Sequence, residues 1–205
     1  DQKGRLMVLR PDSTLPIARL VATRLKNAVL PLRLYYNQDI HTINPSMSGR
    51  RDEVMQTGLE LIGCNSERAD LEVLATAIEA LSVCDTGDFR LEIGDIGVFR
   101  TLSKKLCVDE DTVEEIRTLI ERKNYPALND LLDKIGHNEV TDALKQLPRL
   151  FGGEEVLDRC SALFDDPQIQ EVLKRLRRTY RQLSMLGHDG KIVIDLGIVN
   201  RNDYY

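Results

Sequence analysis

Apolar and polar residues alternate along two segments in the first third of the chain, residues 32–43 and 52–63. Between them, residues 44–51 read NPSMSGRR, a polar stretch with a proline, a glycine and two serines. Alternation with a period of two is typical of β-strands, and a stretch of this composition is typical of a loop. The pattern therefore predicts a long antiparallel hairpin with a basic tip.

The second strand of this hairpin, DEVMQTGLELIG at residues 52–63, has two faces of different character. Side chains alternate across a strand, so one face is mostly apolar and suits a core. That face consists of Met55, Thr57, Leu59 and Leu61. The other face places Gln56 and Glu60 on either side of Gly58, as in the floor of a polar pocket. The alternative is a half-solvated strand whose Gln56 and Glu60 face water.

The spacing of apolar residues predicts helices and further strands in the rest of the chain. Strands are expected at residues 5–9, 89–93 and 191–196. Helices are expected after Asp12-Ser13-Thr14, after Ser66, and at residues 96–106. Residues 108–186 carry only helical patterns, and the longest of these helices begins at Asp165-Asp166-Pro167. We therefore expect an α/β domain of residues 1–106 and 187–205, interrupted by a helical insertion of residues 107–186. The chain begins without Met and ends as another ordered segment starts, which predicts a fragment truncated at both ends.

Composition narrows the function classes. Of the 205 residues, 42% are hydrophobic and 30% charged, which is typical of a soluble globular protein, and no apolar run approaches the ~18 residues of a membrane span. A net charge of -5 argues against nucleic acid as a partner. The cysteines form no C-x-x-C pair and the three histidines are scattered, so no metal and no cofactor is expected. Reduced thiols in a cytoplasmic protein are the simplest interpretation. The cysteines are Cys64, Cys84, Cys107 and Cys160.

Three further stretches carry polar chemistry, each with an ordinary alternative. The basic run at residues 174–181 could meet RNA or an acidic partner, or be the solvated face of a helix. Asp12-Ser13-Thr14 lies where a strand meets a helix, which suits a ligand contact or a helix cap. In DLGIVNRNDYY at residues 195–205, Tyr205 could offer a hydroxyl to a ligand or pack as an aromatic. The chain has no histidine at triad spacing, no G-x-S-x-G and no P-loop.

Taken in order, these segments resemble the catalytic core of histidyl-tRNA synthetase, a class II aminoacyl-tRNA synthetase. Leu-Arg-Pro-Asp-Ser-Thr at residues 9–14 resembles that family's L-R-P-E-G-T. The hairpin of residues 32–63 resembles its motif 2, with Gly49-Arg50 in the loop and Gln56-x-Gly58-x-Glu60-x-x-Gly63 after it. Asp203-Tyr204-Tyr205 resembles the end of the signature L-V-R-G-L-D-Y-Y. The resemblance implies a class II synthetase-like fold, a mainly antiparallel sheet flanked by helices.

The chain departs from the synthetase pattern at two arginines. Motif 2 carries Phe-Arg-x-Glu where this chain has His41-Thr42-Ile43-Asn44, and Asn200 stands at the arginine of L-V-R-G. Arginine suits the charge that develops at phosphorus during adenylate formation, because its fork is planar and always charged. Thr42 and Asn200 carry no charge, and losing one such donor costs about a hundred- to a thousandfold in rate. The departures argue against aminoacylation.

The resemblance also implies a histidine-binding pocket, because positions that line it in the synthetase family keep suitable residues. Those residues are Asp12, Thr14, Gln56, Glu60 and Tyr205. Asp12, Thr14 and Gln56 could accept hydrogen bonds from an α-ammonium group, while Glu60 and Tyr205 suit the two nitrogens of an imidazole. The carboxylate of the ligand lacks its usual arginine, so Arg201, a group outside the chain or a partner subunit would have to serve.

A pocket of this kind without adenylating arginines resembles the regulatory subunits of ATP phosphoribosyltransferase, as does the segment after Ile93-Gly94-Asp95-Ile96. The resemblance implies a non-catalytic protein of histidine biosynthesis that assembles into a hetero-oligomer with a short-form catalytic subunit and transmits feedback by histidine. Two alternatives remain open. An authentic histidyl-tRNA synthetase would catalyse histidine- and ATP-dependent pyrophosphate exchange. A stand-alone amino-acid-binding scaffold would have no phosphoribosyltransferase partner.

Overall fold

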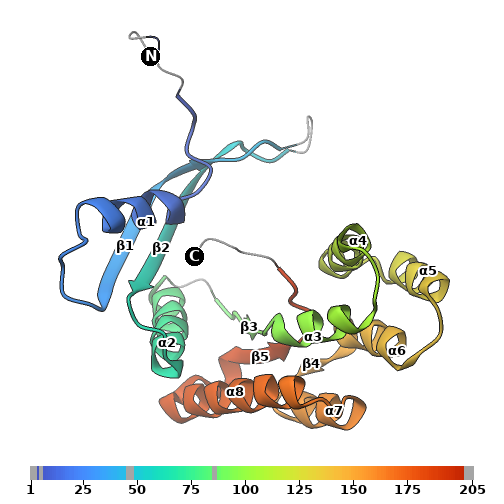
Figure 1. Ribbon diagram of the computed structural model, residues 1–205. Helices are drawn as coiled ribbons and strands as arrows, with labels where there is room; N and C mark the ends of the chain where they lie inside the picture. Colours follow the sequence, from blue (N-terminus) through green and yellow to red (C-terminus); the bar gives the residue numbers. More distant parts are fainter. Residues whose placement is uncertain (1–3, 5–6, 45–48, 85–86, 201–205) are drawn as a thin grey trace. The chain divides into compact units, whose positions relative to one another are not determined.

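The computed structural model describes residues 4, 7–44, 49–84 and 87–200 (Figure 1). The elements of its first part are α1 (Thr14–Thr23), β1 (Leu32–His41), β2 (Glu53–Ile62), α2 (Glu67–Val83), β3 (Leu91–Ile93) and α3 (Gly97–Lys105). Those that follow are α4 (Glu110–Glu121), α5 (Tyr125–Ile135), α6 (Glu139–Gln146), η1 (Leu147–Arg149), β4 (Phe151–Gly152), α7 (Glu155–Leu163), α8 (Pro167–Leu183), η2 (Ser184–His188), η3 (Asp189–Lys191) and β5 (Ile192–Asp195). Contacts divide the chain into two compact units. The described residues up to Ala69 form unit 1, and those from Asp70 to Asn200 form unit 2.

Unit 1 is built on the β1–β2 hairpin. The strands pair antiparallel along their whole length, from Leu32 opposite Ile62 to His41 opposite Glu53. This confirms the hairpin. Its register places Leu34 opposite Glu60 and Asp39 opposite Met55, so matching apolar positions on the two strands would not have given it. The strand expected at residues 5–9 is not formed by residues 7–9, which have no regular structure, and residues 5 and 6 lie outside the described part.

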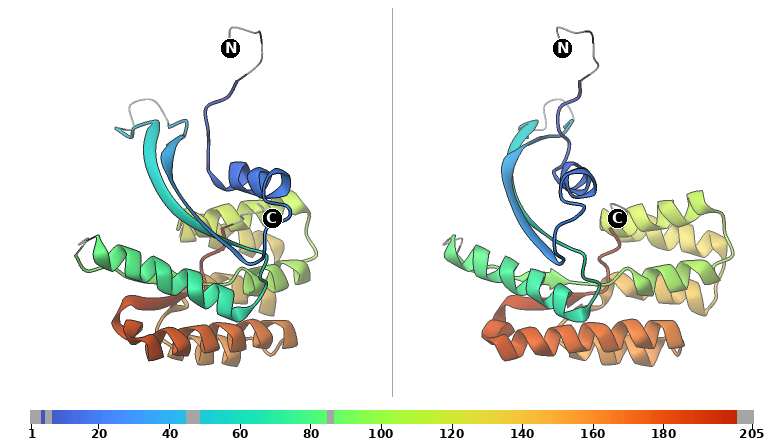
Figure 2. Two further views of the ribbon diagram at one scale, coloured as in Figure 1. Left: turned by 90° about the vertical axis from the view of Figure 1, so that its left-hand side faces the viewer. Right: turned by 60° about the vertical axis from the view of Figure 1, so that its left-hand side comes forward.

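Helix α1 covers the face of the hairpin that carries Gln56 and Glu60, and Figure 2 shows the helix beside the two strands. Ile17 of α1 and Ser13 just before it are buried. The opposite face, which the sequence assigns to a core, is open at Met55 (68% exposed) and at Tyr35 (85% exposed). The expectation for Met55 is wrong because α1 begins with hydroxyl side chains that pack on the polar face.

Unit 2 combines a small sheet with helices around one apolar core. The strand order is β3-β5-β4, with β3 parallel and β4 antiparallel to β5. Side chains from α3 to α8 pack with Ile93 and Ile194 of the sheet, and Leu132, Leu144 and Leu157 are fully buried among them. Strand β3 is shorter than the expected residues 89–93. The stretch expected to be purely helical also contains β4, because Phe151 and Gly152 hydrogen-bond along β5.

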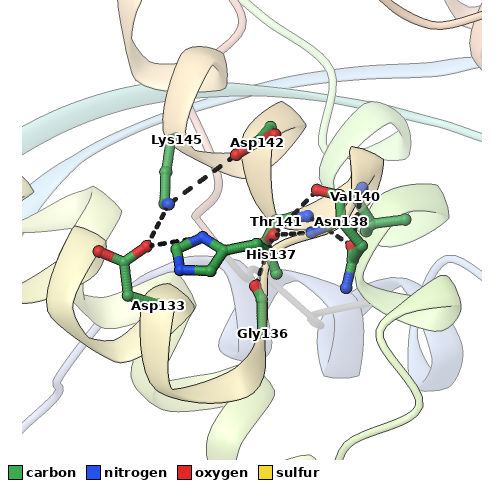
Figure 3. Close-up of polar contacts among 8 residues, drawn as sticks. All are labelled: Asp133, Gly136, His137, Asn138, Val140, Thr141, Asp142 and Lys145. Atoms are coloured by element: carbon green, nitrogen blue, oxygen red, sulfur yellow. Dashed lines mark hydrogen bonds and ion pairs between the residues drawn. The ribbon is translucent and has the colours of Figure 1, made fainter.

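The turn between α5 and α6 shows how local polar contacts fix the helices (Figure 3). The Asn138 side chain accepts hydrogen bonds from the backbone N–H groups of Val140 and Thr141, both at 3.0 Å. In return the Thr141 hydroxyl accepts from the backbone N–H of Asn138 at 3.0 Å. This reciprocal capping satisfies donors that the first turn of a helix leaves without a partner. The cap fixes where α6 starts and therefore how Leu144 enters the core.

Candidate functional site

The start of α1 is joined to the polar face of the hairpin by two side-chain hydrogen bonds. The Thr14 hydroxyl donates to Glu60 Oε1 at 2.9 Å, and Gln38 Nε2 donates to Ser13 Oγ at 2.6 Å. Ser13 is completely buried, and its carbonyl accepts from the backbone N–H of Ile17. These contacts place the residues from Asp12 to Thr14 across β1 and β2, so residues 46 positions apart in the chain meet.

A tyrosine lies between the two polar residues of β2. Tyr36 of β1 is paired with Gly58, and a side chain at Gly58 would collide with its ring, because a Cβ there would lie 2.3 Å from the phenol oxygen. The Tyr36 hydroxyl donates to Gln56 Oε1 at 3.4 Å. Any larger residue at position 58 would therefore force the Tyr36 ring to move.

Burial and two nearby carboxylates influence the protonation of Tyr36. Partial burial raises the pKa of Tyr36 above its ordinary value, and the negative charges of Glu60 and Asp12 raise it further. Tyr36 therefore remains a neutral hydroxyl at physiological pH. The charges of Glu60 and Asp12 therefore both reach the Tyr36 hydroxyl.

Asp12 also takes part in the start of the helix. Its Oδ1 accepts from the backbone N–H of Leu15 at 3.2 Å. Upstream, the carbonyl of Arg10 accepts from the backbone N–H of His41 at 2.7 Å, which ties this segment to the end of β1. Asp12 therefore caps the first turn of α1, and a ligand contact at Asp12-Ser13-Thr14 stays a prediction.

The structure brings four of the predicted pocket residues to one face of unit 1, namely Asp12, Thr14, Gln56 and Glu60. Tyr205 lies outside the described residues. A hollow of about 900 Å³ lies beside them, between residues 8–11 and the end of β1; Gln38 lines it but none of the predicted residues does. Ligand binding by these residues stays a prediction.

Sequence reasoning did not single out Tyr36 and Gln38. The hairpin register contains the signal that could have found them, because residues directly opposite on the two strands share a face. Tyr36 is opposite Gly58, and Gln38 is opposite Gln56. Counting pairs back from the expected loop of residues 44–51 would have paired Tyr36 with Leu59, one residue out of register, so the observed register is needed to place both residues on the polar face.

The basic run on α8 is engaged within unit 2. Arg177 binds Glu154 and Asp158, each at 2.6 Å, and Arg181 also binds Glu154 at 2.6 Å. Arg175 pairs with Asp95. These pairs favour the interpretation of the run as a charged face that holds α8 against its neighbours. Within the described residues, no group of acidic, histidine and cysteine side chains is arranged to hold a metal ion, and no helix is long and apolar enough to cross a membrane.

Comparison with known proteins identifies the same family that the sequence motifs resemble. The family model described as Histidyl-tRNA synthetase matches residues 1–205, the whole chain. The chain belongs to the histidyl-tRNA synthetase family. Solved structures agree: the chain superimposes on a protein from Bacillus halodurans titled ATP phosphoribosyltransferase regulatory subunit/histidyl-tRNA synthetase with a TM-score of 0.89 at 30% identity, covering 100% of this chain and 53% of that one. The class II synthetase-like fold expected from the motifs is confirmed.

Curated relatives within this family carry a regulatory name. The chain is 38% identical over its whole length to the ATP phosphoribosyltransferase regulatory subunit of Clostridium acetobutylicum, and 37% identical to that of Clostridium kluyveri. It covers 51% and 53% of them, so the chain spans about half the length of the curated relatives it matches. A complex titled ATP phosphoribosyl transferase (HisG:HisZ) from Thermotoga maritima shares the fold, with a TM-score of 0.68 at 24% identity over 97% of this chain and 68% of that one.

The two departures from the synthetase motifs have different places in the structure. Thr42 lies in unit 1 just beyond β1, where its hydroxyl accepts from Asn44 Nδ2 at 3.3 Å and its backbone N–H donates to the carbonyl of Asp52. Asn200 lies in unit 2, at a hollow of about 370 Å³ that Lys123 and Tyr125 also line. Thr42 therefore helps to close the hairpin loop.

Proposed function

We propose that the chain is part of a non-catalytic regulatory subunit of ATP phosphoribosyltransferase, which serves the first step of histidine biosynthesis and its feedback regulation. The observation that carries the proposal is the match, over 100% of the chain and at 34–38% identity, to curated proteins of that name. The fold of a histidyl-tRNA synthetase supports it, because such a fold presents an amino-acid pocket independently of the catalytic step that may follow binding.

The proposed effector is histidine, bound on the polar face of unit 1. In this proposal Glu60, which accepts from the Thr14 hydroxyl, also accepts a hydrogen bond from the imidazole, and Asp12 supplies negative charge for the α-ammonium group. Tyr205, which lies outside the described residues, is proposed to contact the other imidazole nitrogen. Tyr205→Phe is therefore expected to weaken histidine binding in calorimetry.

The proposal includes a loss of aminoacylation. Thr42 and Asn200 are uncharged at the positions where the synthetase motifs carry arginine. Each missing arginine removes a donor that stabilises the charge of the adenylating transition state. Binding without activation is what a sensor of histidine needs, because the ligand is then released unchanged.

The partner in this proposal is a short-form catalytic subunit, with self-association giving a hetero-oligomer. Histidine can shift such an assembly only to the extent that it binds the inhibited state more tightly than the active state. The relevant measurement is the phosphoribosyltransferase rate of the assembled protein as a function of histidine concentration.

The test mixes purified full-length protein with the short-form catalytic subunit. Size-exclusion chromatography should show a complex, the phosphoribosyltransferase rate should rise over that of the catalytic subunit alone, and histidine should reverse the increase. Absence of both complex and activation would contradict the proposal. Retained histidine binding in that case would instead point to a stand-alone amino-acid-binding scaffold.

A second function is favoured by one observation, the description of the matching family as Histidyl-tRNA synthetase. An authentic synthetase exchanges pyrophosphate into ATP when histidine is present. Exchange at ordinary synthetase rates by the full-length protein would decide for this function and against the regulatory one. We expect no exchange, because of Thr42 and Asn200.

A further inference from the structure

Tyr36 makes a polar contact as well as a packing contact on the polar face of the hairpin. Its ring lies against Gly58, so closely that a larger residue there would displace the ring, and its hydroxyl donates to Gln56 Oε1 at 3.4 Å. The neighbouring Tyr35 points to the other face of the hairpin and is 85% exposed. The two tyrosines therefore differ in environment although they are adjacent in the chain.

The hydrogen bond from Tyr36 fixes which end of the Gln56 amide is available. A carboxamide has one oxygen that accepts and one nitrogen that donates twice. The oxygen receives the Tyr36 hydroxyl, whereas Nε2 has no hydrogen-bond partner among the described residues. Gln56 is therefore set to donate a hydrogen bond.

A histidine ligand carries one anionic group, and the polar face holds few groups that could receive it. Asp12 and Glu60 are acidic, the Thr14 hydroxyl already donates to Glu60, and Ser13 is completely buried. A carboxylate needs donors. On this side of the hairpin Gln38 Nε2 already donates to Ser13 Oγ, whereas the Gln56 amide nitrogen is partly exposed and has no acceptor among the described residues.

We propose that Tyr36 is a positioning residue of the histidine pocket, whose hydroxyl holds the Gln56 amide with Nε2 toward the α-carboxylate of the ligand. The inference rests on the proposed function and adds the group that recognises the carboxylate. It also changes the expectation for Gln56, which the sequence assigned to the α-ammonium group as an acceptor.

The charges around Tyr36 support this arrangement. Burial and the carboxylates of Glu60 and Asp12 raise the pKa of the phenol, so it keeps its proton over the physiological range. A protonated hydroxyl beside two carboxylates and an amide oxygen acts as a donor. The hydroxyl therefore stays a donor to Gln56 over the physiological pH range, in which histidine carries its carboxylate charge.

The experiment measures binding of histidine and of histamine, which lacks the carboxylate, by calorimetry with full-length protein. Tyr36→Phe removes only the hydroxyl and should weaken histidine binding about three- to tenfold, the effect of one hydrogen bond, while histamine binding stays within twofold. Tyr35→Phe is the matched control and should change neither affinity. Urea unfolding of each variant checks that the hairpin is intact.

A second variant tests whether Gln56 donates a hydrogen bond to the ligand or accepts one from it. Gln56→Glu replaces the donor by a carboxylate, which should weaken histidine binding more than tenfold and leave histamine unaffected or improved. If Gln56 instead accepts from the α-ammonium group, Gln56→Glu should preserve or strengthen histidine binding. That result, or an equal loss of both ligands in Tyr36→Phe, would overturn the inference.

The same measurements separate this inference from the proposed function. The proposed histidine pocket itself would be contradicted if unmodified protein failed to bind histidine, or if Glu60→Ala left histidine binding unchanged. If histidine binding depends on Glu60 but is unaffected by Tyr36→Phe, the pocket stands and only the positioning role proposed for Tyr36 is contradicted.

Discussion

Unit 2 buries a continuous cluster of apolar side chains that runs from Ile93 to Val199, whereas the described part of unit 1 buries Ser13, Ile17 and Ala69. The covered face of the hairpin is polar and is held by hydrogen bonds such as Thr14–Glu60. Burial of apolar area is the main source of stability, while a covered polar group costs free energy unless it is paired. The apolar burial that stabilises the fold is therefore concentrated in unit 2, and the recognition that we propose for unit 1 uses a face held by polar contacts.

The largest expected effect comes from opening the core of unit 2. Leu144 is completely buried, and Leu144→Ala should lower the free energy of unfolding by about 2–5 kcal/mol, because it removes apolar contacts and leaves a cavity. Histidine affinity should stay within twofold. Urea unfolding followed by circular dichroism measures the first quantity and calorimetry the second. Leu163→Ala, at a side chain 51% exposed, is the control and should cost far less. A loss under about 1 kcal/mol would contradict the role assigned to this core.

The next effect concerns binding. Glu60→Ala removes the acceptor of the Thr14 hydroxyl and, in the proposed pocket, of the imidazole N–H. A hydrogen bond to a charged group contributes about 1.5–3 kcal/mol, so histidine affinity measured by calorimetry should fall about ten- to a hundredfold. Glu53→Ala, at an exposed residue on the other face of β2, should leave the affinity unchanged. Equal affinities in unmodified protein and Glu60→Ala would place the effector elsewhere.

A smaller effect on stability is expected at the cap of α6. Asn138→Ala removes the acceptor for two backbone N–H groups and should cost about 1 kcal/mol in thermal or urea unfolding. Asn138→Asp keeps an acceptor at the same place and should retain most of the stability. If both variants were equally destabilised, the contribution would come from packing at this turn and not from the cap.

The smallest effect depends on pH. Arg181, and then Arg177, hold the pKa of Glu154 below its ordinary value of 4.5. The stabilisation by the Glu154 charge is therefore fully present above pH 4.5 and is lost as the pH falls through the lower value in the folded protein. Glu154→Gln should cost about 0.5–1 kcal/mol at pH 7, and the difference should shrink in urea unfolding below pH 4 and in high salt. A difference that does not change with pH would mean that the carboxylate charge is not responsible.

The sequence predicted the hairpin, α3 and the long helix α8 because their periodicity and their end signals agree. It missed β4, since two residues carry no periodicity and Phe151 pairs with Asp195 of β5, a residue distant in the chain that local spacing does not reveal. It assigned Met55 to a core because alternation identifies two faces but not which of them is covered. For the site, it named Thr14 and Glu60, yet their hydrogen bond across the hairpin depends on where α1 settles.

What the sequence by itself determined is the hairpin and most of the helices, the family, and the residue types at the proposed pocket. These follow from local spacing and motif order, which need no knowledge of the packing. Tertiary structure alone decided that α1 covers the polar face, that Tyr36 lies on Gly58, and that the α8 arginines are paired with Glu154 and Asp158. Each of these is a contact between residues distant in the chain, and its geometry is set by steric fit and charge after the chain has folded.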